Sequence, residues 1–305
     1  VSFGAALGVS ALVFRHVFGF EDADPGEAFE DGGGVGGLGQ IEAHVAAGVV
    51  PALPLFGTAM GDIRKVPASA GAEWLLAGFG LLRRAPLASG SVETWTLNDP
   101  ASRNALSEAM VDALLAACER AATDADLRGV VLRGAGGHFC AGGSLGGFAK
   151  TIGQPLAAGE ADPLVPLNRR FGTLLQALCA LPQWLIVAVE GAAMGGGFGL
   201  VCCADQVLAH TSAQFATPEV TLGIVPAQIA PFVVRRLGSS AARRCLLTGE
   251  RWDAAAAQRL GVVDDLVEGD MNAAVRAAIA RHAAAAPQAV AATKRLLLAQ
   301  PETPL

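Results

Sequence analysis

Two glycine-rich turns, each placed after an apolar run, are the segments of this chain best suited to chemistry. The run 184–190 leads to Gly195 and Gly196 in the sequence Met-Gly-Gly-Gly-Phe-Gly-Leu, and the run 129–134 leads to Gly143. A strand that opens through glycines into a helix leaves backbone N–H groups unpartnered at the positive helix end. Such groups hold an anion, or a negative charge that forms on an oxygen during a reaction. We expect the two turns to offer donors to one oxygen; glycines that serve only close packing are the alternative.

The order of these turns and of other motifs resembles the enoyl-CoA hydratase/isomerase (crotonase) superfamily. The resemblance covers roughly residues 88–298, and its landmarks are Asn104–Leu106, His138–Gly143, Gly191–Leu200, Cys203–Asp205, Phe215–Glu219, Leu222–Pro226, Leu247–Glu250 and Thr293–Lys294. It implies an α/β fold, a ClpP/crotonase-like spiral of ββα turns with a helical C-terminal region. It also implies a thioester substrate carried on coenzyme A and an oxyanion hole that stabilises a thioester enolate.

The resemblance assigns the catalytic roles to three residues. The backbone N–H groups of Gly143 and Gly196 are the expected oxyanion donors, where glycine lets the thioester approach closely. Hydratases of this family usually carry two glutamates, and here the first position is Gly199, while the second is retained as Glu219. Because apolar residues flank Glu219, we expect desolvation to raise its pKa and to suit it for general acid–base work.

Gly199 leaves more than one reaction open. A single carboxylate can protonate the α-carbon while a water held elsewhere attacks the β-carbon, which makes a hydratase. It can also move one proton between two carbons, which makes a Δ3-Δ2-enoyl-CoA isomerase. A subunit that binds acyl-CoA without catalysis is the alternative from another class. Residues 197–200 and 225–232 resemble isohexenylglutaconyl-CoA hydratase-type members, and Gly199 is expected to leave space for a bulky, branched acyl chain.

The expected substrate contacts come from the same motifs. By resemblance, Arg103 and Ala105 lie in the turn that meets coenzyme A, with Ala141 and Gly195 beside the thioester. Arg103 would pair with a phosphate, or else face solvent. Gln228 is a polar candidate for holding water or a distal substrate group, and it would otherwise cap a helix. Lys294 occupies a family position near the nucleotide, and His138 is expected to pack at its strand end.

Composition excludes several other classes of function. The net charge of −6 argues against non-specific nucleic-acid binding, and no run of about 18 uncharged apolar residues is present to span a membrane. The histidines show no metal-ligand spacing and the six cysteines no paired motif, so we expect no metal, and buried thiols in the cytoplasm. Coenzyme A enters as part of the substrate, so no separate cofactor is expected. The resemblance implies a homotrimer or homohexamer.

The chain divides at residue 87 on these criteria. Residues 1–87 form an atypical Ala- and Gly-rich extension. We favour a mis-assigned upstream start codon, with Met60 as the true start, over a genuine extension that docks on the core. Residues 88–305 are the expected crotonase-fold domain, and its C-terminus is short by comparison with the family's covering helical segment. The first strand is expected at 92–97. Helices are expected at 107–123 with Ser107 as N-cap, and at 168–181, 227–237, 241–248, 254–260 and 271–299 with a break at Pro287; 148–163 is expected to be a loop.

Overall fold

Strand β5, Trp184–Val189, is buried along its whole length and is an interior strand of the main sheet. Its apolar run has no polar alternation, which is typical of a parallel strand covered on both faces. The computed structural model describes residues 74–75, 81–87, 91–143 and 164–299. Leu185, Val187 and Val189 point into a core with the helices of one face, and Ile186 and Ala188 belong to a second core on the other.

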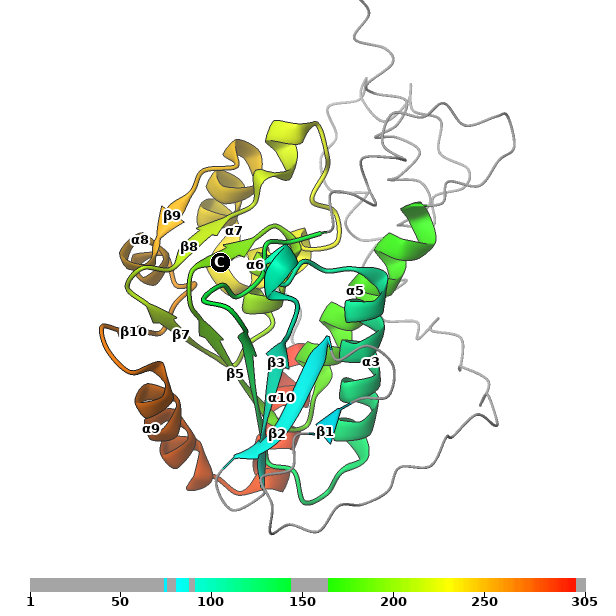
Figure 1. Ribbon diagram of the computed structural model, residues 1–305, viewed down its shortest axis with the longest axis vertical. Helices are drawn as coiled ribbons and strands as arrows, with labels where there is room; N and C mark the ends of the chain where they lie inside the picture. Colours follow the sequence, from blue (N-terminus) through cyan, green and yellow to red (C-terminus); the bar gives the residue numbers. More distant parts are fainter. Residues whose placement is uncertain (1–73, 76–80, 88–90, 144–163, 300–305) are drawn as a thin grey trace, which may run out of the picture. The chain divides into compact units, whose positions relative to one another are not determined.

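The main sheet contains seven described strands in the order β1-β2-β3-β4-β5-β7-β10 (Figure 1). Strands β3, β4, β5, β7 and β10 are parallel, whereas β1 and β2 join antiparallel at one edge. The bounds are β1 Trp74–Leu75, β2 Leu82–Leu87, β3 Val92–Leu97, β4 Gly129–Gly134, β7 Gln206–His210 and β10 Asp265–Val267.

Helices cover the two faces of this sheet. On one face α3, Glu108–Thr123, lies beside α5, Leu164–Ala180, and on the other lies α9, Met271–Ala283 (Figure 1). The remaining helices are η1 Pro100–Ser102, α6 Gly196–Cys202, η2 Pro218–Leu222, α7 Ala230–Thr248, α8 Ala254–Arg259 and α10 Pro287–Ala299.

A second, three-stranded sheet positions the functional residues. It consists of β6, Ala192–Met194, parallel to β8, Gln214–Ala216, which is antiparallel to β9, Trp252–Asp253. Met194 is paired with Ala216, so the residues that follow these strands emerge at the same place. Those residues are the glycine turn at the start of α6 and the η2 segment.

Most of the expected elements are present. Ser107 caps α3, where its side chain accepts a hydrogen bond from the Met110 N–H (N···Oγ 3.2 Å). The two helices expected on either side of residue 238 meet at Gly238, which interrupts α7 with a φ of 71°. Helix α5 begins at Leu164, earlier than the expected residue 168. The expected loop 148–163 and the extension up to residue 73 lie outside the described residues.

The boundary predicted at residue 87 is too late. Strand β2 pairs with β3 along its whole length, and Leu82 lies in the core at 1% exposure. Residues 82–87 therefore belong to the main sheet, ahead of the strand that was expected to be first. Strand β2 is not apparent in the sequence because Arg83, Arg84 and Pro86 interrupt the apolar alternation that is typical of a strand.

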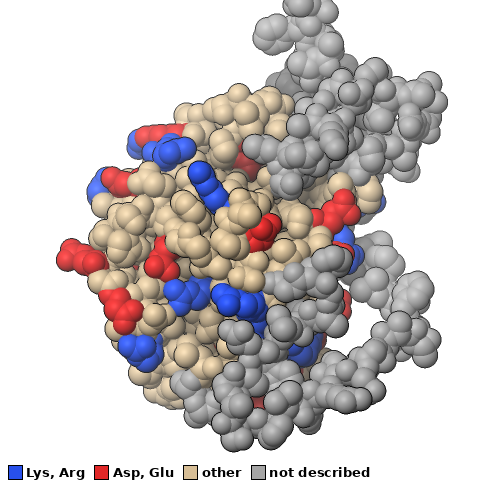
Figure 2. Space-filling model, in the orientation of Figure 1, with Lys and Arg blue, Asp and Glu red and all other residues tan. Residues whose placement is uncertain are grey.

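The surface of the described part shows no segregation of charge on the face drawn in Figure 2. There, basic and acidic side chains are interspersed. Among the described helices, none has the length and apolar character that a membrane crossing requires. The described residues also hold no group of three or more His, Cys, Asp or Glu side chains suited to a metal ion.

Candidate functional site

The first glycine turn is formed at the start of α6. Gly195 is the N-cap with a φ of 52° and a ψ of −119°, a conformation that glycine adopts at little cost, and its N–H donates to the Ala216 carbonyl (N···O 2.8 Å). Gly196 is the first helical residue, so its N–H has no acceptor within the helix. No described residue outside α6 accepts a hydrogen bond from it. One of the two predicted donors is therefore free.

The second turn, Cys140–Gly143, lies directly against the first. The Cys140 N–H donates to the Ala192 carbonyl (N···O 2.8 Å), and the Cys140 carbonyl accepts from the Met194 N–H (2.9 Å). Gly142 has a φ of 91°, and a Cβ atom on it would lie 2.7 Å from the Met194 carbonyl oxygen and 3.6 Å from the Gly195 Cα. The absence of a side chain at this position thus lets the two turns touch.

The orientation of Gly143 follows from its pairing with Leu106. The two residues form a parallel bridge in which the Leu106 N–H donates to the Gly142 carbonyl (N···O 2.8 Å). In such a bridge the neighbours of the middle residue make the hydrogen bonds, so the N–H of the middle residue points away from its partner. The Gly143 N–H therefore faces away from Leu106, and no described residue accepts a hydrogen bond from it.

Glu219 lies beside the first turn. A Cβ atom on Gly195 would be 2.8 Å from the Glu219 Oε1, so the carboxyl group rests on the start of α6. The other oxygen, Oε2, is buried and has no hydrogen-bond partner among the described residues. Burial raises the pKa of Glu219 from its ordinary value, against a smaller opposite effect of a backbone hydrogen bond. The expected desolvation of Glu219 is confirmed, and an unpartnered buried carboxyl oxygen is uncommon away from functional sites.

The η2 segment holds Glu219 in place through its neighbours. Thr217, fully buried, donates its hydroxyl to the Cys245 carbonyl in α7 (O···O 3.0 Å). Pro218 begins the 3-10 helix, and Gly223 ends it in the left-handed conformation with a φ of 73°. The segment is thereby fixed to β8 at one end and to α7 alongside.

Apolar side chains enclose the start of α6. A Cβ atom on Gly196 would lie 2.9 Å from the Leu106 Cδ1 and 3.1 Å from the Phe171 Cζ. Neither Leu106 nor Phe171 was singled out from the sequence as a wall of the site. Their contacts join segments far apart in the chain, and the only sequence signal was the place of Leu106 in the Asn104–Leu106 motif.

The space expected at Gly199 is not there. A Cβ atom on Gly199 would lie 2.5 Å from the Ile229 Cγ2 and 3.7 Å from the Leu175 Cδ2. Ile229 is 3% exposed, so its side chain occupies the volume that a residue at position 199 would need. The prediction of extra room for a bulky, branched chain at this position is therefore wrong.

The residues expected to meet coenzyme A lie next to the second turn. The Ala141 N–H donates to the Arg103 carbonyl (N···O 2.9 Å), and the Ala105 N–H donates to the Ser102 Oγ (3.1 Å). Arg103 has a φ of 55°, and its exposed side chain has no partner among the described residues. It is thus available to a ligand. Gln228 is half-buried against Gly172 of α5, and it directly precedes Ile229, the N-cap residue of α7.

Asn104 holds this turn against the loop that leads to the second glycine turn. It is fully buried, and its amide donates to the carbonyls of Ala135 (N···O 2.9 Å) and His138 (2.8 Å). Its Oδ1 accepts from the Asp99 N–H (2.9 Å). His138 accepts from the Ala192 N–H through Nδ1 (3.3 Å), which agrees with the packing role expected for it.

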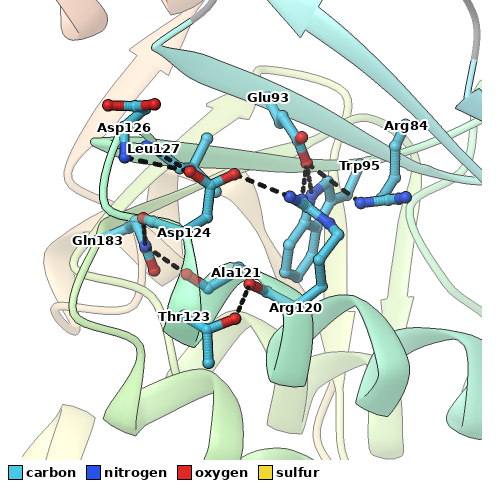
Figure 3. A network of polar contacts seen from close by, with 10 residues as sticks. All are labelled: Arg84, Glu93, Trp95, Arg120, Ala121, Thr123, Asp124, Asp126, Leu127 and Gln183. Atoms are coloured by element: carbon cyan, nitrogen blue, oxygen red, sulfur yellow. Dashed lines mark hydrogen bonds and ion pairs between the residues drawn. The ribbon is translucent and has the colours of Figure 1, made fainter. Parts of the chain in front are cut away.

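Two other groups of charged residues serve the fold. Lys294, expected near a nucleotide, donates to the Asp205 carboxylate (2.6 Å) and to the Gln183 carbonyl (2.7 Å). Glu93 accepts from Trp95 Nε1 (2.9 Å) and from Arg120, and it faces Arg84 (3.7 Å), as Figure 3 shows. Glu93 lies at the beginning of β3, whereas the glycine turns follow the ends of the parallel strands β4 and β5. This network therefore belongs to the opposite end of the sheet from the site.

Comparisons with known proteins show the family to which the chain belongs. A sequence model of the enoyl-CoA hydratase/isomerase family matches residues 88–305. The chain is 35% identical over 215 residues to the 2,3-dehydroadipyl-CoA hydratase of Escherichia coli K12, covering 69% of this chain and 79% of the relative. It is 37% identical over 198 residues to a probable enoyl-CoA hydratase, EchA14, of Mycobacterium tuberculosis, covering 64% and 73%.

Solved structures show the same likeness. AtuE of Pseudomonas aeruginosa is 45% identical with a TM-score of 0.68, covering 74% of this chain and 85% of that protein. An enoyl-CoA hydratase/isomerase of Marinobacter aquaeolei is 42% identical with a TM-score of 0.67, covering 72% and 83%. The fold is therefore the crotonase fold that the motifs predicted. The chain belongs to the enoyl-CoA hydratase/isomerase family of enzymes.

Proposed function

We propose that this enzyme is a hydratase that adds water across the 2,3-double bond of an enoyl-CoA thioester. The observation that carries the proposal is the carboxyl group of Glu219, which rests against Gly195 with one oxygen buried and unpartnered among the described residues. A carboxyl with a raised pKa beside two free backbone donors is suited to transfer a proton to or from the carbon next to a thioester. Retention of this arrangement supports catalysis over acyl-CoA binding alone.

The backbone donors have the task of stabilising the enolate. When charge moves from the reacting carbon to the thioester oxygen, the N–H groups of Gly143 and Gly196 would hold it. Loss of one such donor typically costs roughly 3–4 kcal/mol of barrier. The coenzyme A portion would lie along Arg103, Ala105 and Ala141, beside the second turn, and it comes with the substrate, so no separate cofactor takes part.

An isomerase that moves a double bond with the same glutamate is the second candidate. The observation that favours it is Gly199, because the first of the two glutamates of such hydratases is missing there and Ile229 fills the volume. The apolar walls at Leu106, Phe171 and Ile229 support a largely apolar acyl chain. The proposal that the acyl chain is branched is supported only by the likeness to isohexenylglutaconyl-CoA hydratase-type motifs.

Two further proposals concern the setting of the enzyme. We place it in the cytoplasm, since all six cysteines are free thiols and five of them are buried. We expect a homotrimer or homohexamer, and Leu296 and Leu297, exposed on α10 at 61% and 66%, are apolar groups suited to a subunit contact. Light scattering that shows a monomer at micromolar concentration would count against this assembly.

The reaction is tested with a panel of 2-enoyl- and 3-enoyl-CoA thioesters and mass analysis of the products. A gain of one water from a 2-enoyl thioester supports the hydratase. An isobaric product from a 3-enoyl thioester with no added water supports the isomerase. The E219Q variant is run in parallel, because turnover that survives in it would come from a contaminant or from another residue.

A further inference from the structure

The segment Gln228–Ile229 contacts both α5 and α6. Ile229 packs on Gly199 of α6, as described above. Gln228 lies against Gly172 of α5, where a Cβ atom would overlap the Gln228 Oε1 and lie 3.3 Å from its Cδ. Gly172 therefore has no side chain at the one place where the Gln228 amide approaches α5. The preceding residue, Phe171, contacts Gly196, so this part of α5 also borders one of the two expected oxyanion donors.

The Gln228 amide has unused hydrogen-bonding capacity. Gln228 is half-buried, and within the described residues no donor or acceptor is hydrogen-bonded to its side chain. The side chains that contact α6 beside this segment are apolar: Phe171 on Gly196, and Leu175 and Ile229 on Gly199. An amide that can both donate and accept, next to such an apolar wall, is suited to hold one water molecule in a fixed place.

We propose that Gln228, seated against Gly172, positions the water that attacks the β-carbon and so takes over part of the task of the glutamate that is missing at position 199. This inference rests on the proposed hydratase function. An amide does not accept the proton, so Glu219 remains the single acid–base group. Gln228 is thus a positioning residue.

The step balances with one water and one carboxylate. The water oxygen bonds to the β-carbon while one of its protons passes to the Glu219 carboxylate. The two π electrons of the double bond move to the α-carbon and the thioester oxygen, where Gly143 and Gly196 hold the enolate. Glu219 then gives its proton to the α-carbon and becomes a carboxylate again.

The test measures hydration and enolate chemistry on the same full-length protein. Hydration is followed with the best 2-enoyl-CoA substrate of the panel. Enolate formation is followed as exchange of the α-proton of a saturated acyl-CoA with solvent deuterium, which needs no positioned water. We expect Q228L to lower kcat for hydration by about ten- to hundredfold, with KM changed less than threefold, because a misplaced reactant costs up to about 10² in rate. The exchange rate should fall far less than hydration.

Two further variants separate positioning from structure. Q228E keeps hydrogen-bonding oxygens at the same place, so it should recover hydration relative to Q228L and add a limb to the pH profile. G172A pushes the amide away from α5 and should lower kcat in the wild-type background but not further in Q228L. The matched controls are Q176L, at an exposed position of α5, and G269A, where a Cβ atom has nothing within 4 Å.

The possible results are distinct. Wild-type protein that adds no water to any thioester would refute the proposed function. Wild-type protein that hydrates, with Q228L within threefold of it, would refute only the role of Gln228. A Q228L variant with raised KM and unchanged kcat would show that the amide binds the acyl chain, and would also overturn the inference. Equal losses of hydration and exchange would point to a structural defect and overturn it as well.

Discussion

Replacement of Glu219 by Gln tests the chemistry and the electrostatics of the site with one change. The substitution keeps the size of the side chain but removes the group that gains and loses a proton. If Glu219 is the single acid–base group, turnover should fall by the ~10²–10⁴ that general acid–base catalysis supplies. Acyl-CoA binding should persist, since the backbone donors of Gly143 and Gly196 are unaffected.

The same change should stabilise the fold at neutral pH. Burial raises the pKa of Glu219 above its ordinary 4.5, so the folded protein takes up the charged form less readily than the unfolded chain does. A raised pKa means that this group supports the fold fully below its unfolded value and loses that support as pH rises through the folded value. A tenfold change in a protonation equilibrium on folding is worth about 1.4 kcal/mol. Gln removes the charge, so E219Q should exceed the wild type in stability at about pH 7.

Two measurements check this reasoning. Single-turnover hydration gives the catalytic loss, and urea unfolding gives the free energy of unfolding at about pH 7 and about pH 4, where the stability difference should disappear. E119Q, at an exposed position of α3, makes the same charge change and should stay within about 0.5 kcal/mol of the wild type. Turnover of E219Q within threefold of wild type would refute the mechanism. An E219Q variant less stable at pH 7 would refute the assignment of Glu219 as a desolvated, unpartnered carboxylate.

Three other variants test separate features. G199E should lower the free energy of unfolding by about 1–3 kcal/mol, because its Cβ would lie 2.5 Å from the Ile229 Cγ2; an unchanged urea midpoint would contradict that contact. R103Q should raise KM for acyl-CoA more than for the 3′-dephospho thioester, and equal KM changes would remove Arg103 from phosphate binding. E93Q should cost about 3 kcal/mol of stability, since it leaves Arg84 and Arg120 without their shared carboxylate, whereas D112N breaks an exposed ion pair and should cost under about 1 kcal/mol.

The fold could be predicted where local pattern and global packing agree. Strand β5 is an unbroken apolar run, and α3 begins with a capping serine ahead of an apolar stripe. Each of these elements can therefore be predicted from its own residues. Strand β2 could not be found this way. Arg84 is 8% exposed there, and it is tolerated because Glu93 of the neighbouring strand faces it. That compensation exists only after the strands have paired.

The same distinction between local pattern and tertiary packing applies to the candidate site. The glycine turns and Glu219 could be located from the sequence because each belongs to a continuous motif. The contact between Phe171 and Gly196, and that between Gln228 and Gly172, depend on the packing of α5 against α6 and the segment before α7. Gln228 could be named from the sequence as a polar candidate for the site. No residue near it in the chain indicates that its side chain packs against Gly172.

The substitution at Gly199 shows why backbone donors and side-chain acid–base groups vary independently in such a site. The N–H groups of Gly143 and Gly196 are fixed by strand pairing and by the helix start, and neither depends on the side chain at position 199. A glutamate lost there removes a proton carrier without moving a donor. Ile229 fills the volume at position 199. The polar side chain in this segment is then that of its neighbour, Gln228. Positions 199 and 229 are therefore coupled by packing, and a glutamate at 199 needs a smaller residue at 229 before it can fit.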